Sequence, residues 1–125
     1  MNSRKEITLA SESLYGDEYE SLFLKFLGNT PQLRLIDFFM DNPLLDFTKK
    51  EIMEHTGMAK RTFYEYFPII EKQDIVKIAR KIGRAKLYKI NKNSDIVKKL
   101  RTIERILSMS YLDKEIEFEE DKTII

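Results

Sequence analysis

The most informative feature of this 125-residue sequence is a central segment with a large excess of basic residues. Between Thr48 and Arg101 the chain carries 15 Lys or Arg and 6 Asp or Glu, whereas the segments on either side have a net charge of −4 each and the whole chain only +1. Guanidinium and ammonium groups bind phosphate oxygens, and arginine can also form two hydrogen bonds with the edge of a guanine. The central segment therefore offers the chemistry of a nucleic-acid-binding surface.

The first group of candidate contact residues lies in the segment 59–72, which we predict to be a helix. Phe63, Phe67 and Ile70 have the i, i+4, i+7 spacing of a buried stripe. A step of 100° per residue places Arg61 and Glu65 opposite this stripe. The side chains predicted to face a DNA major groove are Lys60, Arg61, Thr62, Tyr64 and Glu65. The alternative is an ordinary solvated helix face.

A second group belongs to a predicted β-hairpin. Two runs rich in β-branched and aromatic residues, 75–80 and 86–90, flank a loop that contains Gly83. The tip of this hairpin holds a basic cluster of Arg80, Lys81, Arg84 and Lys86. The last three of these are predicted to contact the minor groove or the DNA backbone. The alternative is a surface hairpin whose lysines discourage pairing of its edges.

A third group opens the helix that precedes residues 59–72. Thr48 and Glu51 have the spacing of a capping box, and Gly57 suits the positive φ with which many helices end. Lys49 and Lys50 stand at the N-terminus of this helix, where backbone N–H groups and positive charge both suit a phosphate. Thr48, Lys49 and Lys50 are therefore candidate phosphate contacts, although capping alone explains Thr48.

The residue pattern is not that of an enzyme or a metalloprotein. The sequence has no cysteine, no Gly-rich phosphate loop and no nucleophile motif. The sole histidine, His55, has only Glu51 one turn away and is expected to be an exposed helical residue. We expect no catalytic residue, no metal site and no cofactor. Without a signal-peptide run or the ~18 apolar residues that span a bilayer, the chain is expected to be cytoplasmic and not membrane-bound.

The elements that must position these groups follow from periodicity and turn signals. Apolar residues from Tyr19 to Leu27 recur on one face of a predicted helix of about three turns. Thr30 and Pro31 then open a helix that stops at Asn42, and Ser94 caps a long final helix. The expected division is a flexible arm (1–14), a helical domain with the hairpin (15–94), a C-terminal helix (95–113) and an acidic tail (114–125).

The order helix, helix, turn, helix, hairpin resembles a winged helix-turn-helix domain, and specifically the MarR/ArsR-like broad group of archaeal and bacterial transcriptional regulators. The matching segments are LGNTPQLRLIDFFMDNP (27–43), TKKEIMEHTGMAKRTFYEYFPIIEKQDIV (48–76) and the wing KIARKIGRAKLYKI (77–90). Ala59 departs from the pattern because many such domains carry a Ser or Thr there, and Gln73-Asp74 departs because that turn usually contains Gly. The resemblance implies a mostly α fold with a small β-hairpin and additional N- and C-terminal helices.

The resemblance also implies a function. It implies a sequence-specific, double-stranded DNA-binding transcriptional regulator, commonly a repressor, that acts as a homodimer. Two recognition helices would then lie about one DNA turn (~34 Å) apart and read a pseudo-palindromic site. Terminal helices form the dimer in such proteins, and the expected interface residues are Tyr19, Leu22, Phe23, Phe26, Ile96, Leu100, Ile103, Ile106 and Leu107.

Three alternatives stay open at the level of the sequence. The last helix could pack onto the helix at 19–27 within one chain instead of forming a dimer. The winged helix could be a protein-interaction or adaptor module in a larger transcription or plasmid-partition assembly. The protein could also be a ligand sensor whose pocket is lined by aromatic residues such as Tyr15, Tyr19, Phe23 and Tyr111.

Overall fold

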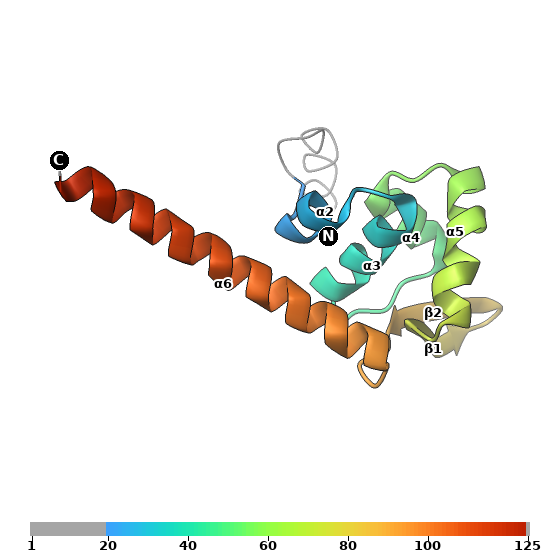
Figure 1. Cartoon of the computed structure of the whole chain (residues 1–125). Helices are drawn as coiled ribbons and strands as arrows, with labels where there is room; N and C mark the ends of the chain where they lie inside the picture. Colours follow the sequence, from blue (N-terminus) through green and yellow to red (C-terminus); the bar gives the residue numbers. More distant parts are fainter. Residues whose placement is uncertain (1–19, 125) are drawn as a thin grey trace.

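The computed structural model describes the backbone of residues 20–124 and the side chains of residues 20–112. Its elements in chain order are α2 (Leu22–Leu27), α3 (Pro31–Asp41), α4 (Lys49–Thr56), α5 (Lys60–Lys72), β1 (Val76–Ile82), β2 (Ala85–Ile90) and α6 (Asp95–Ile124). Helices α2 to α5 and the hairpin form one body, from which α6 projects as a long rod (Figure 1). The predicted mostly helical fold with an antiparallel hairpin is confirmed. The predicted arm, together with Tyr15 and Tyr19, lies outside the described residues.

Helices α2, α3, α4 and α6 begin where short polar side chains cap them. The hydroxyl of Thr30 accepts a hydrogen bond from the Leu33 backbone N–H, and that of Ser94 accepts one from Val97. Thr48 and Glu51 form both bonds of the predicted capping box. Each cap satisfies backbone donors that a helix N-terminus otherwise leaves unpaired. These predicted helix starts are confirmed.

The hairpin is longer and tighter than predicted. Its strands pair from Val76 opposite Ile90 to Ile82 opposite Ala85, so the turn contains only two residues instead of the predicted five. Gly83 opens the turn with φ of 61°, a conformation in which a residue without a Cβ is not strained. The register shifts between Ile78 and Arg80, which is a β-bulge. The sequence predicted the position of the loop correctly. It did not predict how far the two strands pair on either side of the loop.

Two further backbone features fasten the hairpin to the helices. Phe47 and Tyr88 exchange backbone hydrogen bonds of 2.9 and 2.7 Å, so the link between α3 and α4 adds one residue of pairing to the sheet. Asp74, at the entry to β1, has φ of 57°, and its carbonyl accepts a hydrogen bond from the Asn91 side chain. Asp tolerates this left-handed conformation better than most residues, which explains how the turn forms without glycine.

The core is shared by all the elements of the body. Phe63, Phe67 and Ile70 are fully buried, which confirms the predicted stripe of α5. Phe67 stacks on Phe63 at 4.8 Å between ring centroids and meets Tyr88 of β2 edge-on at 5.0 Å. Val97 is the one residue of α6 that is completely buried in the part of the chain described, so only the start of α6 is anchored in this core.

Three expectations were wrong in detail. Helix α2 has six residues, because Ser21 caps it, and is therefore shorter than the predicted three turns. His55 is half-buried against the rings of Phe38 and Phe47, with centroids 5.8 and 5.5 Å away, and is not an exposed residue. Helix α6 continues to Ile124, past the predicted end near residue 113. The cap that shortens α2 is a local hydrogen bond, whereas tertiary contacts decided the burial of His55. Across the described residues, none of the helices is long and apolar enough to cross a lipid bilayer.

Candidate nucleic-acid interface

Helix α5 presents a polar face to solvent. The buried stripe faces inward, while Lys60, Arg61, Tyr64 and Glu65 are exposed and Thr62 is half-buried. This is the arrangement predicted from a 100° step, and it leaves the guanidinium of Arg61 accessible. The N-cap residue, Ala59, makes no side-chain cap, so α5 begins with unpaired backbone donors that no threonine or serine hydroxyl satisfies.

The basic residues of the hairpin differ in whether they form an ion pair within the chain. Lys81, Arg84 and Lys86 are exposed around the two-residue turn. Arg80 instead donates two hydrogen bonds to the carboxylate of Asp46, from Nε to Oδ2 at 2.7 Å and from Nη2 to Oδ1 at 3.2 Å. This ion pair lowers the pKa of Asp46 and ties the wing to the link between α3 and α4. Arg80, which the sequence placed in the basic tip, therefore positions the wing.

The three candidate residues at the N-terminus of α4 also differ in whether their side chains are available to an external phosphate. The carboxylate of Glu51 already accepts the Thr48 N–H at 2.8 Å, and its negative charge lies at the positive end of the helix. The ammonium of Lys49 lies over the rings of Tyr64, Phe67 and Tyr88, at 5.4, 5.6 and 5.8 Å from their centroids. Lys50 is exposed. Of the three, Lys50 has the side chain most available to an external phosphate.

The exposed cations of these elements lack intramolecular partners. Within residues 20–112, the Arg80–Asp46 contact is the one ion pair. The side chains of Lys50, Lys60, Arg61, Lys81, Arg84 and Lys86 therefore have no described carboxylate within ion-pair distance, and we call them the basic face. Helix α5 and the hairpin lie at one end of the molecule, and the free end of α6 lies at the other (Figure 1). Such a surface favours a polyanion.

The residues predicted for a dimer interface divide between the core and the surface. Phe23 is only 1% exposed and belongs to the core of its own chain, and Leu100 packs against that core. Phe26 is 69% exposed, and Ile96, Ile103 and Ile106 are also exposed. Leu22 and Leu107 are half-buried, and Tyr19 lies outside the described residues. Met109 and Leu112, which are not among the predicted interface residues, are about as exposed as Ile106 and extend the apolar surface along α6.

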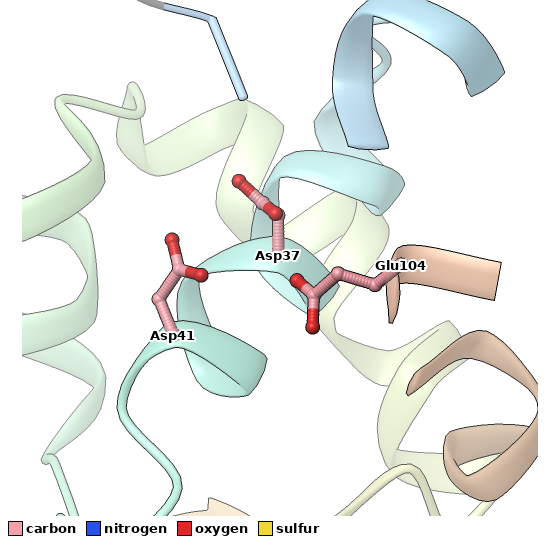
Figure 2. Close-up of side chains that lie close together, drawn as sticks. All are labelled: Asp37, Asp41 and Glu104. Carbon is pink, nitrogen blue, oxygen red and sulfur yellow. The ribbon is translucent and has the colours of Figure 1, made fainter. Parts of the chain in front are cut away.

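A cluster of carboxylates lies where α6 crosses α3. Asp37 and Asp41 of α3 and Glu104 of α6 each place an oxygen within 4.8 Å of the others (Figure 2). Burial, more than repulsion from Glu104, raises the pKa of Asp37 to about 6 even though Ser21 donates a hydrogen bond to it. Partial desolvation, followed by repulsion from the other two acids, raises the pKa of Asp41 to about 7, although this residue remains exposed. The sequence did not reveal this cluster, because Asp37 lies within an apolar helix and Glu104 comes from a distant one.

Comparison with known proteins supports the architecture. No family model matches the chain, and no curated protein matches its sequence. Among solved structures, it is similar to Rv0081 of M. tuberculosis, with a TM-score of 0.51 and 17% identity over 75% of this chain and 89% of that one. It is also similar to MepR, a transcription regulator of the Staphylococcus aureus multidrug efflux pump MepA, with a TM-score of 0.56 and 13% identity over 98% of this chain and 84% of that one. These likenesses show the fold, which is a winged helix-turn-helix.

Proposed function

We propose that the chain is a sequence-specific, double-stranded DNA-binding transcriptional regulator that acts as a homodimer. The observation that carries this proposal is the basic face, whose exposed cations on α4, α5 and the hairpin lack carboxylate partners among the described residues. A solvated surface of mixed charge would pair many of these groups, whereas a DNA-binding surface leaves them free for phosphates. MepR, which is described as a transcription regulator, shares the fold, and this favours the same class of function by analogy.

In the proposed complex, α5 enters the major groove. Arg61 is the best placed to read a base, because its side chain is exposed opposite the buried stripe and can bond a guanine edge at two atoms. Thr62, Tyr64 and Glu65 line the same face, and Lys60 extends toward the backbone. Arg84 and its neighbours in the wing contact the adjacent minor groove or phosphates. The Thr48 hydroxyl caps α4 and the Lys49 ammonium lies over three aromatic rings. Lys50 therefore makes the main contact from α4.

The proposed dimer rests on α2 and α6. Ile106, Met109 and Leu112 are exposed on the part of α6 that leaves the body, beside further apolar residues on its other sides. Its own chain covers part of α6 as far as Leu107, where α2 packs against it, but leaves these apolar residues exposed. A helix that is apolar around much of its circumference requires cover on several sides. A second copy, related by a two-fold axis, supplies that cover and pairs two recognition helices. A dimer of this kind acts most simply by blocking the site it occupies, which favours repression in the cytoplasm.

Selection of bound duplexes from a random pool, followed by fluorescence anisotropy, tests the proposal. Arg61→Ala is expected to weaken binding to the selected site by about 1–3 kcal/mol and to relax base preference at one position of each half-site. Arg84→Ala is expected to weaken binding to all sequences and to reduce the salt slope by about 1 per chain. Arg105→Ala, which removes an exposed arginine on α6, is the matched control and should change neither.

The salt dependence separates this function from its alternative. With about 8–12 phosphates neutralised per dimer, log K against log salt should have a slope of about −7 to −11. An affinity that does not respond to salt would overturn the proposal. Full cellular activity of an Arg61→Ala, Arg84→Ala double variant would favour the protein-interaction module instead.

A further inference from the structure

The carboxylate cluster joins two elements that have different tasks. Asp37 and Asp41 stand one turn apart on α3, inside the winged-helix body, whereas Glu104 belongs to α6. Figure 2 shows the three side chains converging from the two helices. In the part of the chain that the structure describes, no Lys or Arg forms an ion pair with any of them. Three carboxyl groups therefore lie together between α3 and α6 without a basic partner among the described residues.

One carboxylate oxygen of Asp37 is buried without a hydrogen-bond donor among the described residues. Its side chain is only 7% exposed, and one oxygen, Oδ2, accepts a hydrogen bond from Ser21 at 3.1 Å. The other oxygen, Oδ1, is buried and has no hydrogen-bond partner among the described residues. Buried carboxylate oxygens are normally paired, and one that is left unpaired destabilises the fold. The cluster thus contains a buried acceptor that a bound cation would satisfy.

The spacing of the oxygens indicates which cation fits. The three oxygens lie within 4.8 Å of one another, so there is a point between them that lies no more than about 2.8 Å from each. Ca²⁺ binds oxygen at about 2.3–2.6 Å in flexible geometry, so movements of a few tenths of an ångström bring the ligands into place. Mg²⁺ needs about 2.0–2.1 Å and nearly octahedral geometry, which requires a larger closure. Asp41 is exposed and Glu104 half-buried, so water can complete the coordination shell.

We infer that Asp37, Asp41 and Glu104 form a binding site for a hard divalent cation such as Ca²⁺, which fastens α6 to α3. The bound ion would neutralise most of the triple negative charge and give the buried Asp37 oxygen a ligand bond. Carboxylate-only ligands favour such ions over zinc or copper, which prefer imidazole and thiolate. The ion would also fix the direction in which α6 leaves the body.

Titration of the purified full chain with Ca²⁺, Mn²⁺ or Mg²⁺ after removal of metal by EDTA tests the inference without any DNA. Calorimetry is expected to give one ion per chain, with a dissociation constant in the range of about 10⁻⁵–10⁻³ M for Ca²⁺ or Mn²⁺. Thermal unfolding should shift upward with the same ions. The variants Asp41→Asn and Glu104→Gln are expected to weaken binding at least about tenfold. Both positions are reached by solvent, so neither substitution needs to disturb the core.

Glu54→Gln provides the matched control. It removes one exposed carboxylate from α4, away from the cluster, and should retain the wild-type affinity. Absence of binding by all three ions would overturn the inference, as would equal affinity in wild type, Glu104→Gln and Glu54→Gln, which would indicate general charge screening. Loss of binding confined to the two cluster variants supports it. Because no DNA is present, either result is independent of the proposed regulatory function.

Discussion

Replacing Lys49 with methionine removes one ammonium and keeps a similar apolar stem. The ammonium lies 5.4, 5.6 and 5.8 Å from the centroids of Tyr64, Phe67 and Tyr88. A cation over one ring contributes about 0.5–1 kcal/mol at an exposed site and more when it is partly desolvated. All three distances are near the outer limit of about 6 Å, and the rings share one charge. We therefore expect the free energy of unfolding to fall by about 1–2 kcal/mol in Lys49→Met.

Urea unfolding followed by circular dichroism, with all variants at one protein concentration, measures this loss. For a chain of this size it corresponds to a fall in Tm of about 4–9 °C. Lys50→Met is the control, because it removes the same charge from the neighbouring, exposed position. A double-mutant cycle with Tyr64→Leu isolates the contact with the nearest ring, and its coupling energy should be about 0.5–1 kcal/mol.

Two results would refute this reasoning. If Lys49→Met and Lys50→Met lost the same stability, the three rings would not be holding the ammonium. If the cycle between Lys49 and Tyr64 gave no coupling, the attraction to that ring would be absent in solution. Either outcome would return Lys49 to the group of side chains that contact phosphate.

The other predictions concern a helix cap, pH and assembly. Thr48→Ala should lower the free energy of unfolding by about 1 kcal/mol in urea, because the capping hydroxyl is lost. The folded-state pKa values of Asp37 and Asp41, about 6 and about 7, lie above 3.8, so the folded chain binds more protons than the unfolded one between these values. In metal-free urea titrations stability should therefore fall as pH rises from about 4 through 7, and Asp41→Asn should flatten that dependence, whereas a rise with pH would contradict the assigned shifts. Ile106→Glu should convert a dimer to a monomer in solution mass measurements, while Lys98→Glu should not, and an unchanged mass for Ile106→Glu would exclude α6 from the interface.

Much of the fold was predictable because its signals are local. The caps at Thr30, Thr48 and Ser94 depend on residues within three positions of each, and the structure contains all three. The buried stripe of α5 depends on the helical repeat alone. The exposure of Arg61 on the opposite face follows from the same geometry, so the composition of the candidate recognition surface could be read without coordinates.

The boundaries of elements were less predictable, because pairing and packing compete with local preference. The two-residue turn at Gly83 forms because Lys81 pairs with Lys86 and Ile82 with Ala85, which no single-strand pattern reveals. His55 was expected in solvent, but Phe38 and Phe47 come from other parts of the chain to cover it. In both cases the deciding partner is distant in sequence or on a neighbouring strand.

Helix type, helix order and the concentration of basic charge were present in the order of residues along the chain, because capping, periodicity and charge counts involve neighbours only. The tertiary structure alone decided which charged groups contact other side chains of the chain and which are left exposed to solvent. It joins Arg80 to Asp46, and it gathers Asp37, Asp41 and Glu104 at a helix crossing. These interactions depend on the distance between groups brought together by packing of the core, and a linear pattern contains no such distance.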